Sequence, residues 1–258
     1  MAHYAVTGAA GGIGAALCRM LRADGHKVTG FDLAAGDGVY PLDLSDPASI
    51  AAVAGAHGPF DGLCNNAGLP PRAGNAAQVL VVNFLGTRAF TEAMLHQMAP
   101  GASVVNVASR AGQFWREGAA QAARLAALTQ SDDLAAFAEA EGIDATRAYN
   151  LSKEALILWT FANSERLAAQ GLRINAVSPA AVDTAILGDF TQAFGGKVER
   201  NLARAGRAGA PEEIAAVAAF LLSPRSSWIK GADIPVDGGM GAYALSDAMG
   251  LRADFGPS

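Results

Sequence analysis

Thr7-Gly8-Ala9-Ala10-Gly11-Gly12-Ile13-Gly14 is the stretch of sequence that decides the fold of this chain. The apolar run 4–7 predicts a strand before it, and a helix is expected from about residue 12 to residue 24. The glycines let the backbone turn tightly and approach a pyrophosphate, and the helix N-terminus behind them favours its negative charge. Glycine-rich runs are often only turns, but a preceding strand and a following helix are the context that a dinucleotide site needs.

The rest of the chain alternates short apolar strands with amphipathic helices. Strands are expected at 27–32, 39–42, 62–65, 103–108, 173–178 and 232–236, and helices at 46–56, 75–98, 149–170 and 211–222. This pattern predicts the α/β class: a single-domain Rossmann fold with a doubly wound parallel sheet and helices on both faces. Because no linker or internal repeat divides the sequence, residues 1–258 are expected to form one nucleotide-binding domain.

Two stretches depart from this alternation. Residues 113–146 carry Ala-rich helical segments at 118–129 and 132–141, and they form a helical insert before the helix that starts at Tyr149. Residues 184–209 contain several glycines and are expected to be irregular. Both stretches follow strand ends, where ligands bind in open parallel sheets. They are therefore the expected walls and lid of a substrate pocket.

Composition and charge narrow the class of partner. The chain has 258 residues, of which 51% are hydrophobic and 17% charged, so a large buried core is expected rather than disorder. The formal net charge is −5 and no Lys/Arg cluster interrupts the sequence. This argues against nucleic acid or an acidic membrane surface as the main partner, and favours a small-molecule substrate.

The cysteine and histidine content argues against a metal site. Cys18 and Cys64 fall in apolar segments and are expected to be buried and reduced, and the four histidines show no metal-ligand spacing. The chain enters a strand pattern at once, without a basic leader, and its apolar runs are too short to span a bilayer. A cytoplasmic protein without membrane attachment is the expectation.

Polar side chains follow three of the expected strands. Asp32 ends the second strand, where a carboxylate can accept both hydroxyls of an adenosine ribose and would repel a 2′-phosphate, which favours NAD over NADP. Asp32 could instead cap the turn that follows. Asp43, at the end of the third strand, could meet an adenine amino group or merely begin the next helix. Asn65-Asn66-Ala67-Gly68 closes the fourth strand, and its small residues would let a ribose pass close to the backbone.

Tyr149 and Lys153 lie four residues apart on an expected helix, and therefore on one face of it. A nearby ammonium favours the phenolate form and would lower the pKa of the tyrosine. A tyrosine tuned in this way can exchange protons with an alcohol or ketone near neutral pH. The same spacing also occurs by chance on solvated helix faces.

Taken together, these motifs resemble the short-chain dehydrogenase/reductase family over essentially the whole chain. The resemblance rests on the run from Thr7 to Gly14, on Asn65-Asn66-Ala67-Gly68, Asn83, Ser109, Tyr149 with Lys153, and on the segment from Pro179 to Thr184. It implies a nicotinamide cofactor and hydride transfer to or from a carbonyl or hydroxyl carbon. The residues that it implies for cofactor binding are Gly8, Gly12, Ile13, Gly14, Asp32, Asp43, Leu44, Asn66, Ala67, Gly68, Tyr149, Lys153, Val182 and Thr184.

The resemblance also implies catalytic roles. Tyr149 would be the general acid and base, and Lys153 would lower its pKa and hold the nicotinamide ribose. Ser109, together with Tyr149, would bind the substrate oxygen, and Asn83 would hold a water that relays protons. Ser109 could alternatively be a helix or turn cap, and Asn83 a kink in a long helix. A protein that binds NAD(H) as a sensor and catalyses nothing is disfavoured, because such proteins typically lose the tyrosine or the lysine.

Departures from the family pattern suggest a subgroup. Ala180 stands where the family usually has glycine, the loop from Gly68 to Asn83 is short, and Ser109 and Tyr149 lie much farther apart than in most members. These features are similar to the bacterial 3α-hydroxysteroid dehydrogenase/carbonyl reductase subgroup. A bulky apolar alcohol or ketone, steroid-like or cyclic, is the expected substrate, with aromatic alcohols as the alternative.

The apolar residues of the insert and lid would line such a pocket, or they could pack against the core or a second subunit: Phe114, Trp115, Phe137, Ile186, Leu187, Phe190 and Phe194. The resemblance further implies a homodimer or homotetramer. Related folds assemble through the two long helices, and the insert is expected to cover that surface and select a dimer.

Overall fold

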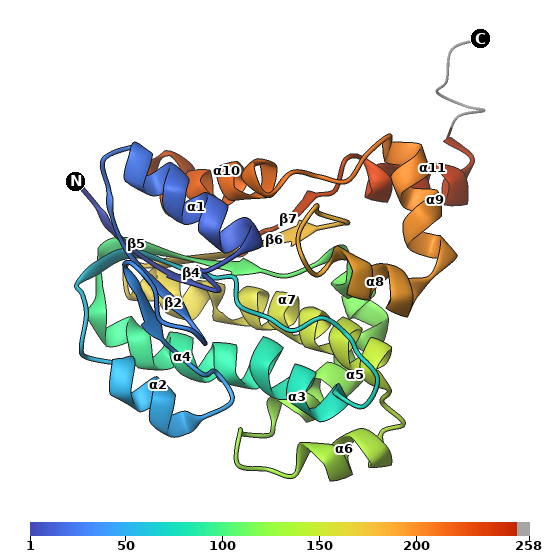
Figure 1. Ribbon diagram of the computed structural model, residues 1–258, viewed down its shortest axis with the longest axis horizontal. Helices are drawn as coiled ribbons and strands as arrows, with labels where there is room; N and C mark the ends of the chain where they lie inside the picture. Colours follow the sequence, from blue (N-terminus) through green and yellow to red (C-terminus); the bar gives the residue numbers. More distant parts are fainter. Residues whose placement is uncertain (252–258) are drawn as a thin grey trace.

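The computed structural model describes residues 1–251. Its centre is a sheet of seven strands: β1 (His3–Thr7), β2 (Lys27–Asp32), β3 (Val39–Pro41), β4 (Phe60–Asn65), β5 (Met98–Val107), β6 (Arg173–Pro179) and β7 (Asp233–Val236). The spatial order is β3-β2-β1-β4-β5-β6-β7, and every neighbouring pair is parallel (Figure 1). The expected doubly wound α/β sheet is confirmed; the tail 252–258 of the expected domain lies outside the described residues.

Helices cover both faces of the sheet. On one face lie α1 (Gly12–Ala23) and α10 (Pro211–Leu222), and on the other lie α2 (Pro47–Val53), α3 (Ala76–Leu80), α4 (Thr87–Met94) and α7 (Ala145–Ala169) (Figure 1). The strands are apolar on both sides because each face packs against helices, with fully buried side chains such as Leu17 and Leu221 on one face and Phe90 and Met94 on the other.

The chain reverses direction across the sheet between β1 and β4. From β1 it proceeds outward to β2 and β3, and it then returns to place β4 on the opposite side of β1. The loops at the carboxyl ends of β1 and β4 therefore diverge and leave a crevice between them, which is where ligands bind in open α/β sheets.

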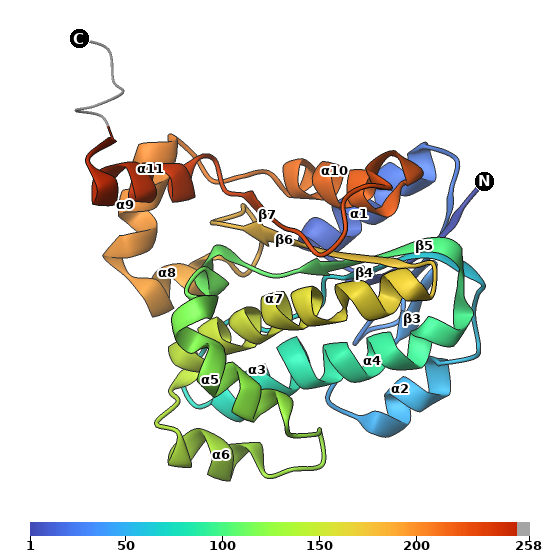
Figure 2. The same cartoon turned by 180° about the vertical axis from the view of Figure 1, so that it is seen from behind.

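The expected insert consists of two helices, α5 (Trp115–Ala126) and α6 (Leu134–Ala140). The view from behind shows α5 lying against α7 and α6 beyond it, on the side away from the sheet (Figure 2). The Trp115 and Phe161 rings meet edge to face at 5.2 Å between centroids, which fixes the start of α5 on α7.

The prediction of one long helix over residues 75–98 is wrong in detail. The segment forms α3, a π-helical turn at Val81–Gly86, α4 and a 3₁₀ turn at Leu95–Gln97, and β5 already begins at Met98. Two loops pack closely on the π-helical turn. The Asn83 amide binds both backbone groups of Leu69, and a side chain at Gly86 would overlap the Leu44 carbonyl. Such tertiary contacts cannot be predicted from helical periodicity in the sequence.

The expectation of an irregular segment at 184–209 is also wrong. It contains α8 (Leu187–Phe194) and α9 (Gly196–Ala205), and the glycines that suggested irregularity lie mostly within helices. Gly195, with φ of 53°, forms the corner between the two helices. A further helix, α11 (Met240–Met249), follows β7 and was not expected. Together α8, α9 and α11 form the wall at the carboxyl edge of the sheet (Figure 1).

Candidate active site

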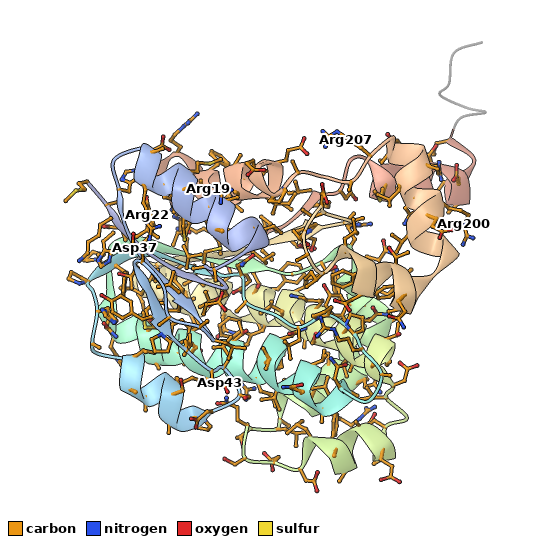
Figure 3. All side chains as sticks on the ribbon, viewed as in Figure 1. Arg19, Arg22, Asp37, Asp43, Arg200 and Arg207 are labelled. Carbon is orange, nitrogen blue, oxygen red and sulfur yellow. The ribbon has the colours of Figure 1, made fainter. Side chains whose placement is uncertain are left out.

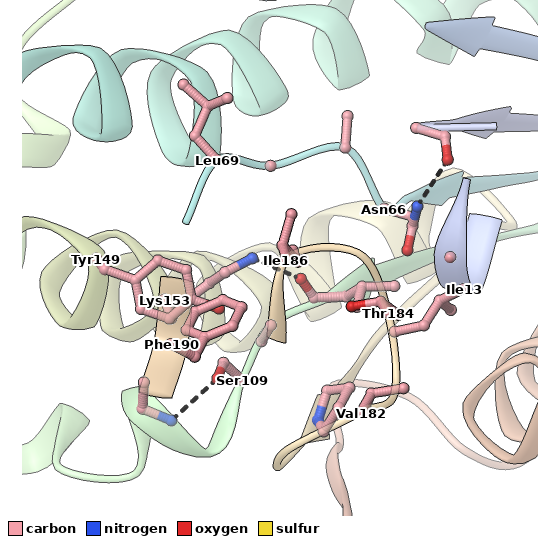
Figure 4. A pocket seen from close by; sticks show the side chains of 18 of the residues that line it. Ile13, Asn66, Leu69, Ser109, Tyr149, Lys153, Val182, Thr184, Ile186 and Phe190 are labelled. Atoms are coloured by element: carbon pink, nitrogen blue, oxygen red, sulfur yellow. Dashed lines mark hydrogen bonds between the residues drawn. The ribbon is translucent and has the colours of Figure 1, made fainter. Parts of the chain in front are cut away.

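One cavity of about 650 Å³ opens at the carboxyl edge of the sheet, in the crevice between β1 and β4. Its lining joins the glycine loop and Asp32 at one end to Ser109, Tyr149 and Lys153 at the other. Figure 4 shows Tyr149 and Lys153 projecting from α7 toward the loop that carries Val182, Thr184 and Ile186. The structure thus brings together residues that are separated by more than half of the chain.

The glycine loop leaves the N-terminus of α1 open toward the cavity. Gly8 and Gly12 adopt φ of 66° and 50°, a left-handed conformation that favours glycine. The N-cap residue, Gly11, offers no side-chain acceptor to the first turn, and a Cβ on it would meet nothing within 4 Å. Unpaired amide groups at a helix start bind anions, so this turn suits the diphosphate of a dinucleotide.

The segment after β4 is fixed to the glycine loop by hydrogen bonds. The Asn66 side chain donates to the carbonyls of Thr7 and Gly8, at 3.1 Å each. In return the Thr7 hydroxyl accepts from the backbone N–H groups of Asn66 and Ala67, at 3.0 Å each. The side chain of Asn66 therefore shapes the glycine loop, while Ala67 and Gly68 line the cavity.

Asp32 holds the glycine loop from the end of β2. Its carboxylate accepts from the backbone N–H groups of Ala10, at 2.9 Å, and Leu33, at 2.8 Å. It also lines the cavity. Among the residues of the described chain that line this cavity, the cationic side chains are Arg110 and Lys153, and neither belongs to the end with the glycine loop.

Asp43 lies on the loop before α2 and lines the cavity (Figure 3). The N-cap of α2 is Asp46, which accepts from the Ala48 N–H, so the alternative that Asp43 begins this helix is wrong. The Asp43 carboxylate instead accepts from the backbone and hydroxyl of Ser45, at 2.8 and 2.6 Å. This bond sets the conformation of the loop that contains Leu44.

Leu44 is reached from the insert. The Gln130 side chain, in the loop between α5 and α6, donates to the Leu44 carbonyl at 2.6 Å. Sequence reasoning did not find Gln130, because the two residues are far apart in the chain and no motif marks either of them. The insert therefore touches the loop expected to face adenine.

Ser109, Tyr149 and Lys153 meet at the other end of the cavity. The Ser109 hydroxyl lies beside the Tyr149 phenol and lowers its pKa. The Ser109 oxygen also accepts from the Ala111 N–H at 3.1 Å, so the cap alternative holds alongside the contact with the tyrosine. The Lys153 ammonium donates to the Val107 carbonyl at 2.9 Å and lies 5.7 Å from the centroid of the Tyr149 ring.

Burial controls the ionisation of both groups on α7. It raises the pKa of Tyr149 to about 12, and the neighbouring Ser109 hydroxyl offsets part of that rise. Burial lowers the pKa of Lys153 to about 8. In the protein alone the pKa of the tyrosine therefore moves opposite to the direction expected from a neighbouring ammonium, because desolvation raises it.

Asn83 lies close to Lys153 across Gly68. A Cβ on Gly68 would lie 3.2 Å from Asn83 Oδ1 and 3.7 Å from Lys153 Nζ. The Asn83 amide accepts from the Leu69 N–H at 2.7 Å and donates to the Leu69 carbonyl at 3.0 Å. Asn83 therefore does more than kink a helix. From the π-helical turn, its side chain anchors the loop that follows β4.

Residues of the segment 184–209 form an apolar wall beside Tyr149. Phe190 packs edge to face on Tyr149, with centroids 5.1 Å apart, and Phe194 follows at 6.3 Å (Figure 4). Ile186, Phe190 and Phe194 line the cavity together with Val182 and Thr184. Thr184 lies against the glycine loop, since its methyl group would be 3.1 Å from a Cβ on Gly12.

The two helices of the insert do not form a wall of this cavity, which corrects the sequence-based expectation. Of the expected insert 113–146, all of which lies in the described chain, Gln113 alone lines it. Trp115 and Phe137 pack against the apolar cluster around α7, and Phe114 is exposed. Leu187, in the segment expected to be the lid, is also absent from the lining. The insert packs on the outside of α7 because its apolar residues match that face.

Other sequence-based expectations concern metals and membranes. Both cysteines are buried and free. Within residues 1–251 there is no group of three or more His, Cys, Asp or Glu side chains that could hold a metal ion. In the same part of the chain, none of the helices combines the length and the apolar character needed to cross a membrane.

Comparison with protein families covers most of the chain. Residues 2–128 match the family described as short chain dehydrogenase, and residues 133–241 match the family described as Enoyl-(Acyl carrier protein) reductase. The gap between the two matches falls within the insert, in the loop that carries Gln130.

Individual relatives are similar over nearly the full length. The chain is 36% identical over 250 residues to the coniferyl-alcohol dehydrogenase of Pseudomonas sp. (strain HR199 / DSM 7063), covering 91% of this chain and 94% of that protein. It is 32% identical over 255 residues to the 3-alpha-hydroxysteroid dehydrogenase/carbonyl reductase of Comamonas testosteroni, covering 94% and 97%. The solved structure of the 3-alpha-hydroxysteroid dehydrogenase from Pseudomonas sp. B-0831, complexed with NADH, has a TM-score of 0.84 at 34% identity, covering 95% and 98%.

Proposed function

The chain belongs to the short-chain dehydrogenase/reductase family, and from this premise we propose that it transfers hydride between NAD(H) and a secondary alcohol or ketone of a bulky apolar substrate. It is an oxidoreductase of alcohol and ketone groups that uses a nicotinamide cofactor. The observation that carries the finer proposal is the single cavity that connects the glycine loop and Asp32 with Ser109, Tyr149 and Lys153.

The preference for NAD(H) follows from charge at the adenosine end of the cavity. A 2′-phosphate placed there would face the Asp32 carboxylate, with neither cationic side chain of the described cavity lining at hand to compensate. The two ribose hydroxyls of NAD would instead donate to the same carboxylate. The unpaired amides at the start of α1 would bind the diphosphate.

The nicotinamide ring supplies the hydride, and the side chains of this chain manage the oxygen and its proton. Ser109 and Tyr149 donate hydrogen bonds to the substrate oxygen, which gains negative charge during reduction. At neutral pH Tyr149 holds its proton, because burial raises its pKa to about 12, and it can therefore give that proton to the reduced oxygen. Lys153, and water near Asn83, would return a proton to the phenol. Oxidation follows the reverse path.

Steroid-like or cyclic ketones fit the apolar wall. Phe190 and Phe194 extend the apolar surface beside the Tyr149 ring, and we propose that residues 184–209 act as the lid over this part of the cavity. Flat ring systems bind well against aromatic faces and exclude water from the reacting carbon. The similarity to two hydroxysteroid dehydrogenases supports this class of substrate.

A second candidate is an aromatic alcohol of the cinnamyl type. The observation that favours it is the 36% identity to a coniferyl-alcohol dehydrogenase over 91% of the chain. The same aromatic wall would accept a phenyl ring.

A substrate screen with NADH fluorescence tests the proposal. Steroids, cyclic ketones and benzylic and cinnamyl alcohols would be offered in both directions, and the substitution Tyr149→Phe should lower kcat at least about a hundredfold while NADH still binds. Tyr40→Phe, on an exposed tyrosine outside the cavity, is the matched control and should retain turnover. Near-normal turnover of Tyr149→Phe would refute the mechanism. NADH binding without turnover of any compound would instead indicate a cofactor sensor.

A further inference from the structure

Two polar side chains of the cavity have no role in the proposed function so far. Arg110 and Gln113 lie at opposite ends of the short turn that Ser109 caps, and both line the cavity. This turn ties their position to that of the Ser109 hydroxyl. Near them the cavity is bounded by Met240, Gly241 and Ala244, at the start of α11.

An ion pair with Asp237 and close packing against Gly241 fix the position of Arg110. Its Nε donates to the Asp237 carboxylate at 3.1 Å, and the Asp237 side chain is only 9% exposed. Asp237 is itself fixed, because its two oxygens accept from the backbone N–H groups of Gly239 and Gly241, at 3.0 and 2.9 Å. Gly241 makes room for the guanidinium, since a Cβ there would lie 2.6 Å from Arg110 Nη2.

Arg110 in turn fixes the orientation of Gln113. The Nη2 group of Arg110 donates to Gln113 Oε1 at 2.5 Å. Reversing the amide would place two donor groups against each other, so the Gln113 NH₂ group must point away from Arg110. Within the described residues this NH₂ group has no hydrogen-bond acceptor, and neither has Arg110 Nη1. The turn therefore presents oriented, unsatisfied N–H donors at a cavity whose other walls are largely apolar.

We propose that Gln113 and Arg110 are specificity-determining residues that bind an oxygen acceptor on the substrate, separate from the oxygen at the reacting carbon. This inference rests on the proposed function and narrows its substrate class. The acceptor is a neutral oxygen, such as a hydroxyl, methoxyl or carbonyl group, because Asp237 already balances the charge of Arg110. A partly buried donor without a partner costs free energy, so substrates that lack this oxygen bind less well.

Matched pairs of substrates test this inference. Coniferyl alcohol and cinnamyl alcohol share the reacting end and differ in the oxygens on the ring; androsterone and androstan-3α-ol differ in the same way for steroids. For the pair that is turned over, kcat/KM should be about tenfold higher for the oxygenated member, which corresponds to one hydrogen bond. Gln113→Leu should reduce this ratio to nearly one.

Two further variants distinguish the loss of the N–H donor from an effect on folding. Gln113→Glu keeps an oxygen for Arg110 but has no N–H to donate, so it should lose the selectivity even if Gln113→Leu folds poorly. Gln170→Leu, an exposed position outside the cavity, should keep the ratio of the unchanged protein. A ratio near one in the unchanged protein, or a full ratio in both Gln113 variants, would overturn this inference alone. Turnover of neither pair would overturn the proposed function as well.

Discussion

Tyr149 and Lys153, the proposed catalytic pair, show how a residue pair can be recognised while its ionisation is misjudged. Spacing places Tyr149 and Lys153 on one helix face, but it does not reveal that both are buried. Desolvation penalises the charged form of each group, and it therefore raises the pKa of the tyrosine and lowers the pKa of the lysine. The folded protein therefore holds, close together, a protonated phenol and an ammonium group that loses its proton more readily than an ordinary lysine.

The buried lysine should reduce stability at neutral pH. Its pKa in the folded protein is about 8, below its ordinary value of 10.5. Below pH 8 both folded and unfolded states carry the ammonium, so the burial cost is fully present. Between pH 8 and 10.5 the unfolded chain binds more protons, and the free energy of unfolding rises with pH. At pH 7 the free energy of unfolding of Lys153→Met should therefore exceed that of the unchanged protein by about 1–2 kcal/mol. This net value already subtracts the lost hydrogen bond to the Val107 carbonyl.

Urea unfolding at pH 7 and pH 10 measures this difference, which should shrink at the higher pH. Lys230→Met, at an exposed position, should show no such pH-dependent gain. Equal stability of Lys153→Met and the unchanged protein at pH 7 would contradict the account. Turnover of Lys153→Met should be lost, because stability and activity make opposite demands on this position.

Asp32 is expected to determine the choice of cofactor. Replacing it with alanine removes the negative charge that a 2′-phosphate would meet, so the ratio of kcat/KM for NADP to that for NAD should rise at least about tenfold. Steady-state kinetics with both cofactors measure the ratio. Asp37→Ala is a matched control, because Asp37 is exposed at the opposite end of β3 from Asp43 (Figure 3). An unchanged ratio in Asp32→Ala would exclude a role in cofactor selection.

At the scale of elements, the insert is attached to the domain at both ends. Arg147 and the buried Glu154, both on α7, form a bidentate ion pair that Gln121 of α5 joins through a hydrogen bond. A side chain at Gly118 would overlap Glu154, so the glycine permits this close approach. At the other end, Arg88 donates to the carbonyls of Ala126 and Leu128, and Gln130 to that of Leu44.

The contact between Gln130 and Leu44 should support cofactor binding. Because we place adenine beside Leu44, Gln130→Leu should weaken NADH binding about threefold to tenfold, the worth of one hydrogen bond. AMP should lose affinity by the same factor, whereas nicotinamide mononucleotide should not. Fluorescence and calorimetric titrations measure these constants.

Gln121→Leu is the matched control, since it loosens the other end of the insert without touching the adenine loop. A purely structural role of Gln130 would lower the melting temperature and affect both halves of the cofactor alike. That outcome would refute a positioning role.

At the scale of the whole molecule, the insert covers part of α7, one of the two long helices through which the family resemblance implies assembly. It lies against the outer side of α7, where Trp115 packs on Phe161 (Figure 2). A tetramer formed through α4 and α7 would have to displace it. Two large apolar side chains are exposed elsewhere: Phe220 on α10 is 37% exposed, and Trp228, a few residues after its end, is 93% exposed.

We therefore expect a homodimer in solution that buries Trp228 and leaves the insert uncovered. Light scattering should give twice the mass of the chain, and Trp228→Ser should shift the protein toward monomer because it removes a large apolar contact. Phe114→Ser removes an aromatic that is also exposed, but on the insert, and should leave the dimer intact. A tetramer with the insert at its interface would contradict this arrangement.

The sequence alone determined the class of fold and the identity of the proposed site residues. Strand periodicity, the glycine loop and the spacing of Tyr149 and Lys153 are local signals, and local geometry follows from them directly. Asp32 and Asn66 were found for a similar reason: each stands at the end of a strand, and the carboxyl ends of parallel strands meet at one edge of the sheet. Ser109 was identified by the family resemblance.

Only the tertiary structure decided which surfaces these elements present to one another. It turned the glycine-bearing segment 184–209 into helices, placed α5 and α6 outside the cavity, and joined Gln130 to Leu44 and Arg110 to Asp237. It also fixed the direction of both pKa shifts. Each of these outcomes depends on burial and on contacts between residues distant in the chain. Neither burial nor such contacts produce a periodic pattern in the sequence.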